Sequence, residues 1–193
     1  VFQMSSNSLS GSLPSQFGGM TKLTSRFWLN SNELSGSIPS ELGALTGMAS
    51  FFRLYANELC DEIPSEVAAL STQVTSSWSI STGNDLGTPC PTPAPSPAPT
   101  PSPTQYAVLS SLYSSTAGAS WYTNTNWMSG DPCTAGWYRV TCTGGEVTWL
   151  QPSQNNLAGS LPSELGLLSE MKAYFSFNSN SLTGAIPSEL AGM

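Results

Sequence analysis

The sequence predicts an α/β solenoid, a stack in which one structural turn is repeated along the chain. Three observations predict it: a recurring pattern Asn-x-Leu-x-Gly-x-(Leu/Ile)-Pro, a constant step of 25 residues within each half of the chain, and apolar residues at fixed offsets from the asparagine. Self-similarity of this length is typical of repeat proteins in which each turn packs on the next. The pattern is carried by Asn7, Asn32, Asn57, Asn155 and Asn180.

The residues before each asparagine predict a strand. With the asparagine as position 0, apolar side chains occupy positions −5 and −3, as Phe27 and Leu29 do. Alternation with period two is typical of a strand that buries one face. Apolar residues at +2, +6, +10 and +13 complete about six inward side chains per turn, each worth roughly 1.5–3 kcal/mol when buried. Because neighbouring turns must cover these side chains, a single turn is not expected to fold alone.

The polar and special residues of the repeat have structural roles of their own. The asparagine amide can both donate and accept hydrogen bonds along the stack, so we expect the five asparagines to form a ladder. A glycine at +4, such as Gly36, permits a tight turn, and Asp61 replaces it in one copy. The proline at +7 fixes φ and prevents a long helix from starting there.

These residues carry a family resemblance. The segments 35–43 (SGSIPSELG), 158–166 (AGSLPSELG) and 183–191 (TGAIPSELA) resemble the plant-type leucine-rich repeat with its L-x-G-x-I-P core. The resemblance implies a right-handed superhelix with a parallel β-sheet on its concave face and short helical or 3-10 segments on its convex face. The family consensus has 24 residues, and one extra residue lies here between position +16 and the next strand. The extra residue recurs, so we interpret it as a subfamily trait.

The chain divides into three parts. Residues 91–104 alternate proline with small residues, which favours an extended polyproline II linker and excludes a packed core. Residues 1–90 hold three repeats and an atypical fourth, and they resemble the C-terminal part of a leucine-rich repeat domain. Residues 105–193 begin with a helical pattern and three tryptophans and resemble the N-terminal cap and first two repeats of a second domain. The tryptophans, which we expect in the core of that cap, are Trp121, Trp127 and Trp137.

Two arrangements of these parts remain open. The chain is either a fragment of a longer protein with tandem domains, or one permuted five-repeat solenoid in which the open ends stack on each other. Parallel strands step about 4.8 Å, so five turns need roughly 25–30 Å, and the linker reaches about 40 Å. Contacts between the turns around Phe2 and Phe175 would favour the permuted arrangement, and exposed edges at both places would exclude it.

The net charge and the cysteine content indicate the cellular compartment and the classes of partner to expect. The net charge is −7, so neither nucleic acid nor an anionic membrane surface is an expected partner, and no apolar run is long enough for membrane insertion. The four cysteines allow three connectivities, and the linker argues against pairs that cross it. The natural pairs are Cys60–Cys90 and Cys133–Cys142, each within its own cap. Disulfides persist in oxidising compartments, so we expect an extracellular or cell-surface location.

The sequence predicts no enzyme, no cofactor and no metal site. It contains no histidine, which removes the usual general base and the common zinc ligand. The glutamates recur at position +9, on the expected convex side, rather than as a close pair. The adjacent Asp61 and Glu62 stand beside Cys60, where we expect a role in the cap.

The exposed positions of the strands predict a binding surface. Side chains at −6, −4, −2 and −1 face the concave sheet, and exposed Trp, Tyr and Arg are enriched at binding hot spots. Trp28, Arg53 and Tyr55 are expected to be neighbours across adjacent strands. Stacking together with hydrogen bonding suits a protein, peptide or glycan ligand. The candidate residues are Arg26, Trp28, Phe51, Arg53, Tyr55, Trp149, Gln151 and Tyr174.

The sequence therefore predicts an extracellular recognition module that binds through its concave face. Receptor ectodomains, receptor-like proteins and inhibitors of polygalacturonases share the architecture that the resemblance implies, but none has a residue set that transfers to this chain. One alternative is a structural, adhesive or ice-contacting repeat protein without a discrete ligand, which requires flat rows of small polar residues. Another is a fragment of a receptor kinase ectodomain.

Overall fold

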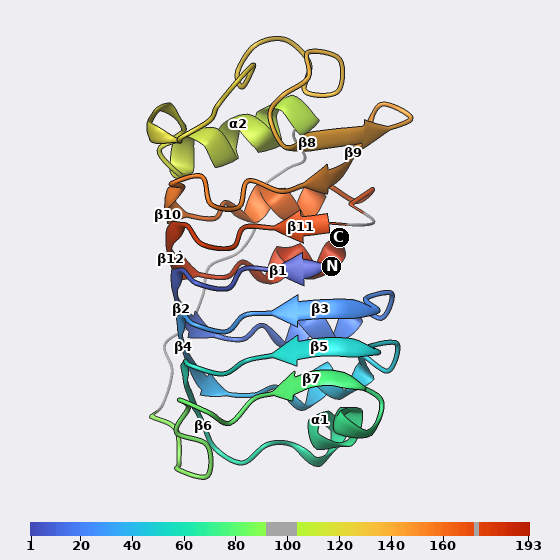
Figure 1. The fold of residues 1–193 in the computed structure, drawn as a ribbon, viewed down its shortest axis with the longest axis vertical. Helices are drawn as coiled ribbons and strands as arrows, with labels where there is room; N and C mark the ends of the chain where they lie inside the picture. The colour runs from blue at the N-terminus through green and yellow to red at the C-terminus, as the bar shows by residue number, and fades with distance from the viewer. Residues whose placement is uncertain (92–103, 172–173) are drawn as a thin grey trace.

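The structure, a computed structural model, describes residues 1–91, 104–171 and 174–193, which form an elongated stack of turns (Figure 1). Seven strands form one sheet in the order β7-β5-β3-β1-β11-β9-β8, and five shorter strands form a second sheet in the order β10-β12-β2-β4-β6. Nine of the ten strand pairings are parallel, and only β8 and β9 pair antiparallel. The interior of the predicted linker lies outside the described residues.

The seven-stranded sheet comes from the strand positions that the sequence predicts. Positions −5 and −3 face the core, where Phe27 and Leu29 are fully buried, because alternate side chains of a strand point to opposite faces. The strands are β1 (Phe2–Gln3), β3 (Ser25–Trp28), β5 (Ser50–Arg53), β7 (Ser76–Ser79), β8 (Val140–Thr143), β9 (Glu146–Leu150) and β11 (Tyr174–Ser176).

The second sheet occupies positions where the sequence predicted only a turn. The backbone from +1 to +5 is extended, and each copy pairs with the next copy of the stack rather than closing on itself. Gly11 and Gly36 both adopt φ of +79°, a conformation that costs glycine little and other residues more. The strands are β2 (Ser8–Ser12), β4 (Glu33–Ser37), β6 (Glu58–Cys60), β10 (Ala158–Ser160) and β12 (Ser181–Ala185).

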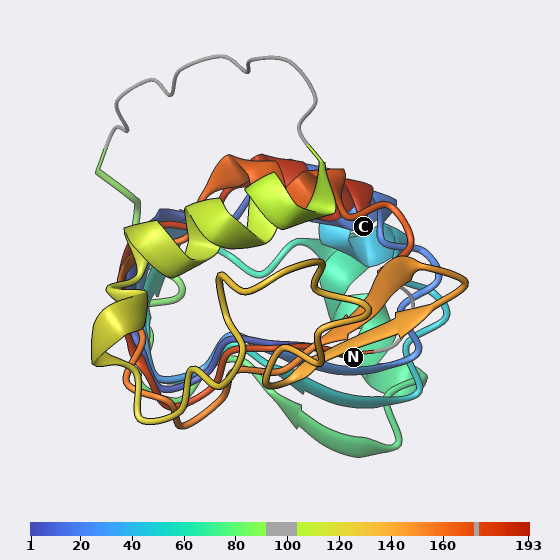
Figure 2. The same cartoon turned by 90° about the horizontal axis from the view of Figure 1, so that it is seen from above.

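Short helices close each turn on the side of the core opposite the seven-stranded sheet (Figure 2). The proline at +7 directly precedes all of them except η3, as Pro39 precedes η2. The residue at +9 lies in the first turn and is a glutamate in every copy but the first, which has Gln16. The repeat helices are η1 (Ser15–Gly19), η2 (Ser40–Ala44), α1 (Ser65–Ala69), η3 (Leu70–Thr72), η5 (Ser163–Leu167) and η6 (Ser188–Gly192). Parallel strands with short 3-10 segments behind them agree with the predicted fold class.

The two halves of the chain meet in the middle of the stack. Strand β1 pairs with β3 on one side and with β11 on the other, where Phe2 is in register with Phe175. Strand β2 likewise pairs with β12. The pieces 1–90 and 105–193 thus pack as consecutive turns, which is the contact that the permuted arrangement requires. Their assignment to domains of a longer protein stays a prediction.

One row of aromatic rings crosses this junction inside the core. Phe2 lies between Phe175 and Phe27, with ring centroids 5.4 and 5.8 Å apart and rings nearly parallel. Phe52 and Trp78 continue the row at 5.2 and 4.9 Å. Offset-stacked pairs of this kind contribute about 0.5–1.5 kcal/mol beyond the area they bury.

The asparagine side chains bond from turn to turn. Asn57 Oδ1 accepts from Leu34 N at 3.1 Å, and its Nδ2 donates to Leu29 O and Leu54 O. Asn7 does the same across the junction, where it accepts from Leu182 N. Asn84, which the sequence analysis did not assign to the ladder, extends it to the fourth turn. The bonds of Asn84 go to Leu54 O, Ile80 O and Leu59 N.

Both ends of the stack are covered. Helix α2 (Gln105–Ser115) and η4 (Gly118–Ser120) begin the second piece, and the three tryptophans of that cap are buried and in contact through their rings. The disulfide Cys133–Cys142 lies in this cap, and Cys60–Cys90 lies at the other end beside β6. There Asp61 accepts a hydrogen bond from Cys90 N at 3.1 Å.

Candidate functional site

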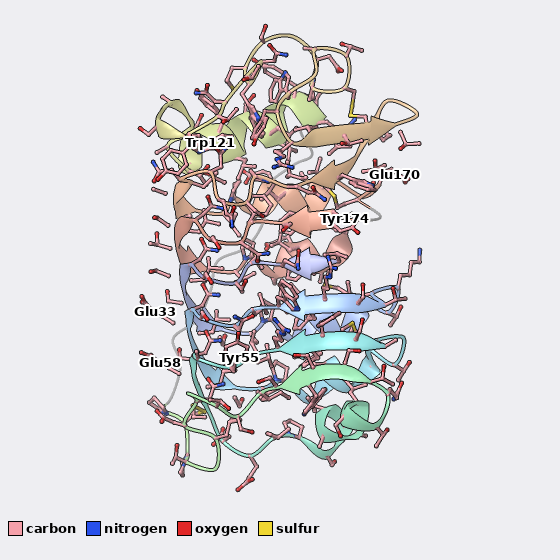
Figure 3. The ribbon with its side chains drawn as sticks, in the orientation of Figure 1. Glu33, Tyr55, Glu58, Trp121, Glu170 and Tyr174 are labelled. Carbon is pink, nitrogen blue, oxygen red and sulfur yellow. A yellow bond between two sulfur atoms is a disulfide. The ribbon has the colours of Figure 1, made fainter. Side chains whose placement is uncertain are left out.

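The candidate site is the outer face of the seven-stranded sheet, which we call the sheet face. It consists of the side chains at −6, −4 and −2, which point away from the core. Figure 3 labels Tyr174 beside β11 and Tyr55 beyond the end of β5, whereas Glu33 and Glu58 project from the side formed by the second sheet. The eight candidate residues divide here into two groups and two separate side chains.

The first group, which we call the cation–π cluster, consists of Arg26, Trp28, Phe51 and Arg53. The guanidinium of Arg53 lies 4.7 Å from the Trp28 ring and 5.4 Å from the Phe51 ring. Arg26 lies 5.8 and 6.0 Å from the same two rings, which meet each other edge to face at 6.1 Å. Each such contact contributes about 0.5–1 kcal/mol at an exposed site.

A left-handed residue on each of two neighbouring strands builds this cluster. Ser25 pairs with Ser50 and Phe27 with Phe52, so Arg26 and Phe51 occupy matching positions between these pairs. These two residues have φ of +54° and +57°. A left-handed conformation costs a non-glycine residue roughly 1–2 kcal/mol, and such strain concentrates at functional sites.

The two guanidinium groups have no acidic partner. No carboxylate in the described part of the chain forms an ion pair with Arg26 or Arg53, although the chain has 12 acidic residues and only five basic ones. Arg53 Nε donates instead to Ser77 Oγ at 3.0 Å. Burial, and then the charge of Arg26, lowers the pKa of the Val1 ammonium below its usual range. This part of the sheet face is therefore positively charged and open to an anionic group.

Two polar atoms beside the cluster lack hydrogen-bond partners among the described residues. They are Nε1 of Trp28, a donor, and Oδ1 of Asn30, an acceptor, and both are buried. A buried polar group left unpaired costs about 1–3 kcal/mol. Unpaired groups and backbone strain thus coincide on β3 and the residues that follow it.

The second group is an aromatic pair of Trp149 and Tyr174. Their ring centroids are 4.6 Å apart at an interplanar angle of 48°, and the two residues are in register on β9 and β11. Trp149 is 39% exposed, which makes it one of the most exposed large apolar side chains of the sheet face. It offers a flat ring surface to a ligand.

A hydrogen-bonded polar floor lies between the two groups, and the sequence analysis did not identify it. Ser176 Oγ contacts Ser153 Oγ at 2.9 Å and donates to Gln3 Oε1 at 3.1 Å. Asn178 Oδ1 accepts from both the backbone N and the Oγ of Ser5. The floor spans the junction between the two halves. Its signal in the sequence was only a run of small polar residues at −4 and −2.

The remaining two candidates stand apart. Trp28 and Arg53 are register partners, as expected, but Tyr55 makes no ring contact with either of them within the described ranges. Tyr55 and Gln151 are both half-buried on the sheet face. Of the three residues expected to be neighbours, Trp28 and Arg53 are in contact, and Tyr55 lies two residues beyond Arg53 in the chain.

Besides the sheet face, two kinds of feature bear on function: a cluster of metal-binding side chains and a membrane-spanning helix. Across residues 1–91, 104–171 and 174–193, no three His, Cys, Asp or Glu side chains gather in a way that could hold a metal ion. Within the same ranges no helix has the length and apolar character needed to cross a membrane.

Comparison with known proteins identifies similar structures but no family. No protein-family model matches the chain, and no curated protein matches it. A solved structure of a TDR receptor is 21% identical over 97% of this chain and 23% of its own, with a TM-score of 0.39. The leucine-rich repeat ectodomain of the plant membrane receptor kinase GASSHO1/SCHENGEN3 from Arabidopsis thaliana, in complex with CASPARIAN STRIP INTEGRITY FACTOR 2, is 26% identical over the whole of this chain and 17% of its own, with a TM-score of 0.40.

The chain therefore spans less than a quarter of either similar protein. At these TM-scores the likeness transfers neither ligand nor activity to this chain.

Proposed function

We propose that this chain is an extracellular or cell-surface recognition module that binds a protein, peptide or glycan through the sheet face. The observation that carries the proposal is the cation–π cluster, in which two guanidinium groups lie over aromatic rings and have no carboxylate partner among the residues that the structure describes. Arginine and tryptophan are the residue types most enriched at binding hot spots. The two disulfides favour an oxidising compartment.

The chemistry of the cluster favours a ligand with an anionic group and a flat apolar part. Guanidinium groups form charge-assisted hydrogen bonds with carboxylates, and such bonds are roughly twice as strong as neutral ones. The Trp149–Tyr174 pair supplies a second stacking surface on the same face. A ligand that spans both groups would cross the polar floor between them.

A binding screen tests this proposal. The immobilised chain is exposed to neutral and uronate-containing oligosaccharides and to acidic and neutral peptides, and binding is measured by biolayer interferometry. We expect acidic probes to bind and the triple variant Trp28→Ala, Arg53→Ala, Tyr55→Ala to lose that binding with an unchanged circular dichroism spectrum. Equal binding by the variant, or no binding by any probe, would refute the proposal.

Arg139 provides the matched control. Its guanidinium lies 5.3 Å from the Tyr138 ring, so it forms a cation–π pair of the same kind in the cap, away from the cluster. Arg139→Gln should leave binding within about twofold of the parent, whereas Arg53→Gln should weaken it at least tenfold. Similar losses in both variants would mean that net charge, and not the cluster, governs binding.

The second sheet gives one observation in favour of the structural alternative. Its positions +3 and +5 carry small hydroxyl side chains in most turns, which include Ser10, Ser35 and Thr183, although Cys60 and Glu62 interrupt these rows in the third turn. Such rows are what an ice-contacting or adhesive surface requires. Glu33 and Glu58 project from the same sheet and interrupt its uniformity, so we rank this function second. Thermal hysteresis or inhibition of ice recrystallisation by the chain, lost in Thr183→Tyr, would favour it over ligand recognition.

A further inference from the structure

The junction between the two halves is held by non-covalent contacts alone in the described part of the chain. Phe2 is 1% exposed and Phe175 is 2% exposed, and their rings stack at 5.4 Å. Asn7 Nδ2 donates to Phe177 O at 3.0 Å, which carries the asparagine ladder across the same boundary. Each disulfide closes within one half, so neither links the halves.

Separation of the halves would expose two complementary edges. One edge would present Phe2 and the unpaired backbone of β1 and β2, and the other would present Phe175 with β11 and β12. Exposed parallel edges with apolar side chains are templates for pairing with another chain. The edge of residues 1–91 can therefore pair with the edge of residues 104–193 from the same copy or from another copy of the chain.

The connection between the halves must cross the length of the stack. Cys90 lies at the β6 end and α2 lies beyond β10, and the sheet order places four strand steps between β6 and β10. Figure 1 shows β6 and α2 at opposite ends. With about 4.8 Å per step and one further turn for α2, the span is roughly 24 Å. Thirteen residue steps join Pro91 to Thr104, and at about 3.1 Å per step they reach roughly 40 Å.

We propose that this junction is also an interface between copies of the chain, in which residues 1–91 of one copy stack on residues 104–193 of a second copy. Two copies arranged antiparallel place the β6 end of each stack beside the α2 end of the other, so both connections remain short. The result is a closed dimer that buries the same surfaces as the single chain. Domain swapping of this kind requires no contact that the single chain lacks.

In the swapped dimer, the residues of one sheet face come from two copies of the chain. The cation–π cluster belongs to the first half, and Trp149 with Tyr174 belongs to the second half. The polar floor joins Gln3 to Ser176 across the boundary. In a swapped dimer each sheet face therefore contains residues of both copies. This inference does not depend on the ligand proposed above.

Shortening the connection tests the inference in the intact chain. Deletion of residues 94–101 leaves five residue steps, about 16 Å, which cannot cover the span of roughly 24 Å within one copy. We expect this variant to run in size-exclusion chromatography with light scattering as a dimer of twice the chain mass, with the circular dichroism spectrum of the parent. A folded monomer of the deletion variant would overturn the proposal. Because a short tether supplies an effective concentration near millimolar, the parent is expected to be a monomer at micromolar concentration and to form the swapped dimer only as its concentration approaches the millimolar range.

A complementation experiment decides the matter if the deletion variant does not fold. Phe2→Asp disables one edge and Phe175→Asp disables the other, because each places a charge in a buried aromatic row. When the two variants are refolded together, one intact junction can form. It joins the first half of the Phe175→Asp variant to the second half of the Phe2→Asp variant. We expect a heterodimer, detected with two affinity tags, that neither variant forms by itself. Absence of this heterodimer would also overturn the proposal.

Discussion

The asparagine ladder gives the sharpest test of how the stack is stabilised, and Asn57 is the position to change. Asn57 is 7% exposed, and its side chain bonds to the preceding turn and to its own turn. In Asn57→Ala the backbone N–H of Leu34 loses its acceptor inside the core. The carbonyls of Leu29 and Leu54 lose one donor each but keep another, from Asn32 and Asn84 respectively.

The expected loss of stability follows from this difference. An orphaned buried N–H costs about 1–3 kcal/mol, whereas a hydrogen bond to a group that keeps a second partner is worth about 0.5 kcal/mol at the low end of its range. Together these contributions predict that Asn57→Ala lowers the free energy of unfolding by about 3 kcal/mol. The substitution should leave the urea m-value unchanged, because the surface exposed on unfolding is the same.

Urea unfolding followed by tryptophan fluorescence measures this effect. Asn156→Gly is the control, because Asn156 is half-buried, its amide donates once, to Ser120 O at 2.9 Å, and glycine tolerates its φ of +59°. We expect the control to lose less than 1 kcal/mol. A loss in Asn57→Ala that lies within 1 kcal/mol of the control would refute the assignment of the ladder as a source of stability.

Three further predictions follow from local geometry, each measured by the same unfolding assay. Gly43→Ala should destabilise the chain by about 2 kcal/mol, because a Cβ there would overlap Glu66 of the next turn; an unchanged midpoint would contradict this. Ala56→Gly should stabilise it by about 0.5 kcal/mol, since Ala56 is exposed at φ of +54°, and a loss would speak against backbone strain. Removal of the Cys60–Cys90 disulfide, with a sequence separation of 30, should lower the free energy of unfolding by about 3.6 kcal/mol. Removal of Cys133–Cys142, with a separation of 9, should lower it by about 2.6 kcal/mol, and the reverse order would be inconsistent with loop-closure entropy.

The strands of the large sheet could be predicted from the sequence because the alternation of apolar residues reports burial directly. Phe27 and Leu29 are two residues apart and both fully buried, as a strand with one covered face requires. The second sheet carries no such alternation. Only the leucine at +2 faces the core there, as Leu34 does, and the pairing is made by backbone groups that every sequence possesses. A pattern of side chains therefore could not reveal it.

The last turn of the first half also contains a feature that the repeat pattern could not predict. Asn84 joins the ladder 27 residues after Asn57, out of step with the period of 25. One extra residue precedes the strand, because Trp78 pairs with Phe52 at a separation of 26, and a second lies between Ile80 and Asn84, which are four positions apart where Leu54 and Asn57 are three apart. The bonds of Asn84 to neighbouring turns depend on where the backbone places the amide, and a fixed offset in the sequence does not define that place. The extra residue of each repeat was visible as a count, but the count did not show that Arg26 and Phe51 adopt a left-handed conformation.

Left-handed residues occur in β3, β5 and β7 but not among the described residues of β9 and β11. In the latter pair Tyr174 lies directly opposite Trp149, and the two strands still continue the core. A left-handed residue at this position is thus not a requirement of stacking. The three left-handed residues are Arg26, Phe51 and Ser77. Two of them belong to the cation–π cluster, and the third accepts the hydrogen bond from Arg53. Positive φ also occurs elsewhere in the chain, for example at Ser31 and Ala56. At the cluster, backbone strain of roughly 1–2 kcal/mol per residue coincides with two guanidinium groups that have no carboxylate partner among the described residues, and this coincidence is the physical reason to look for the ligand on this part of the sheet face.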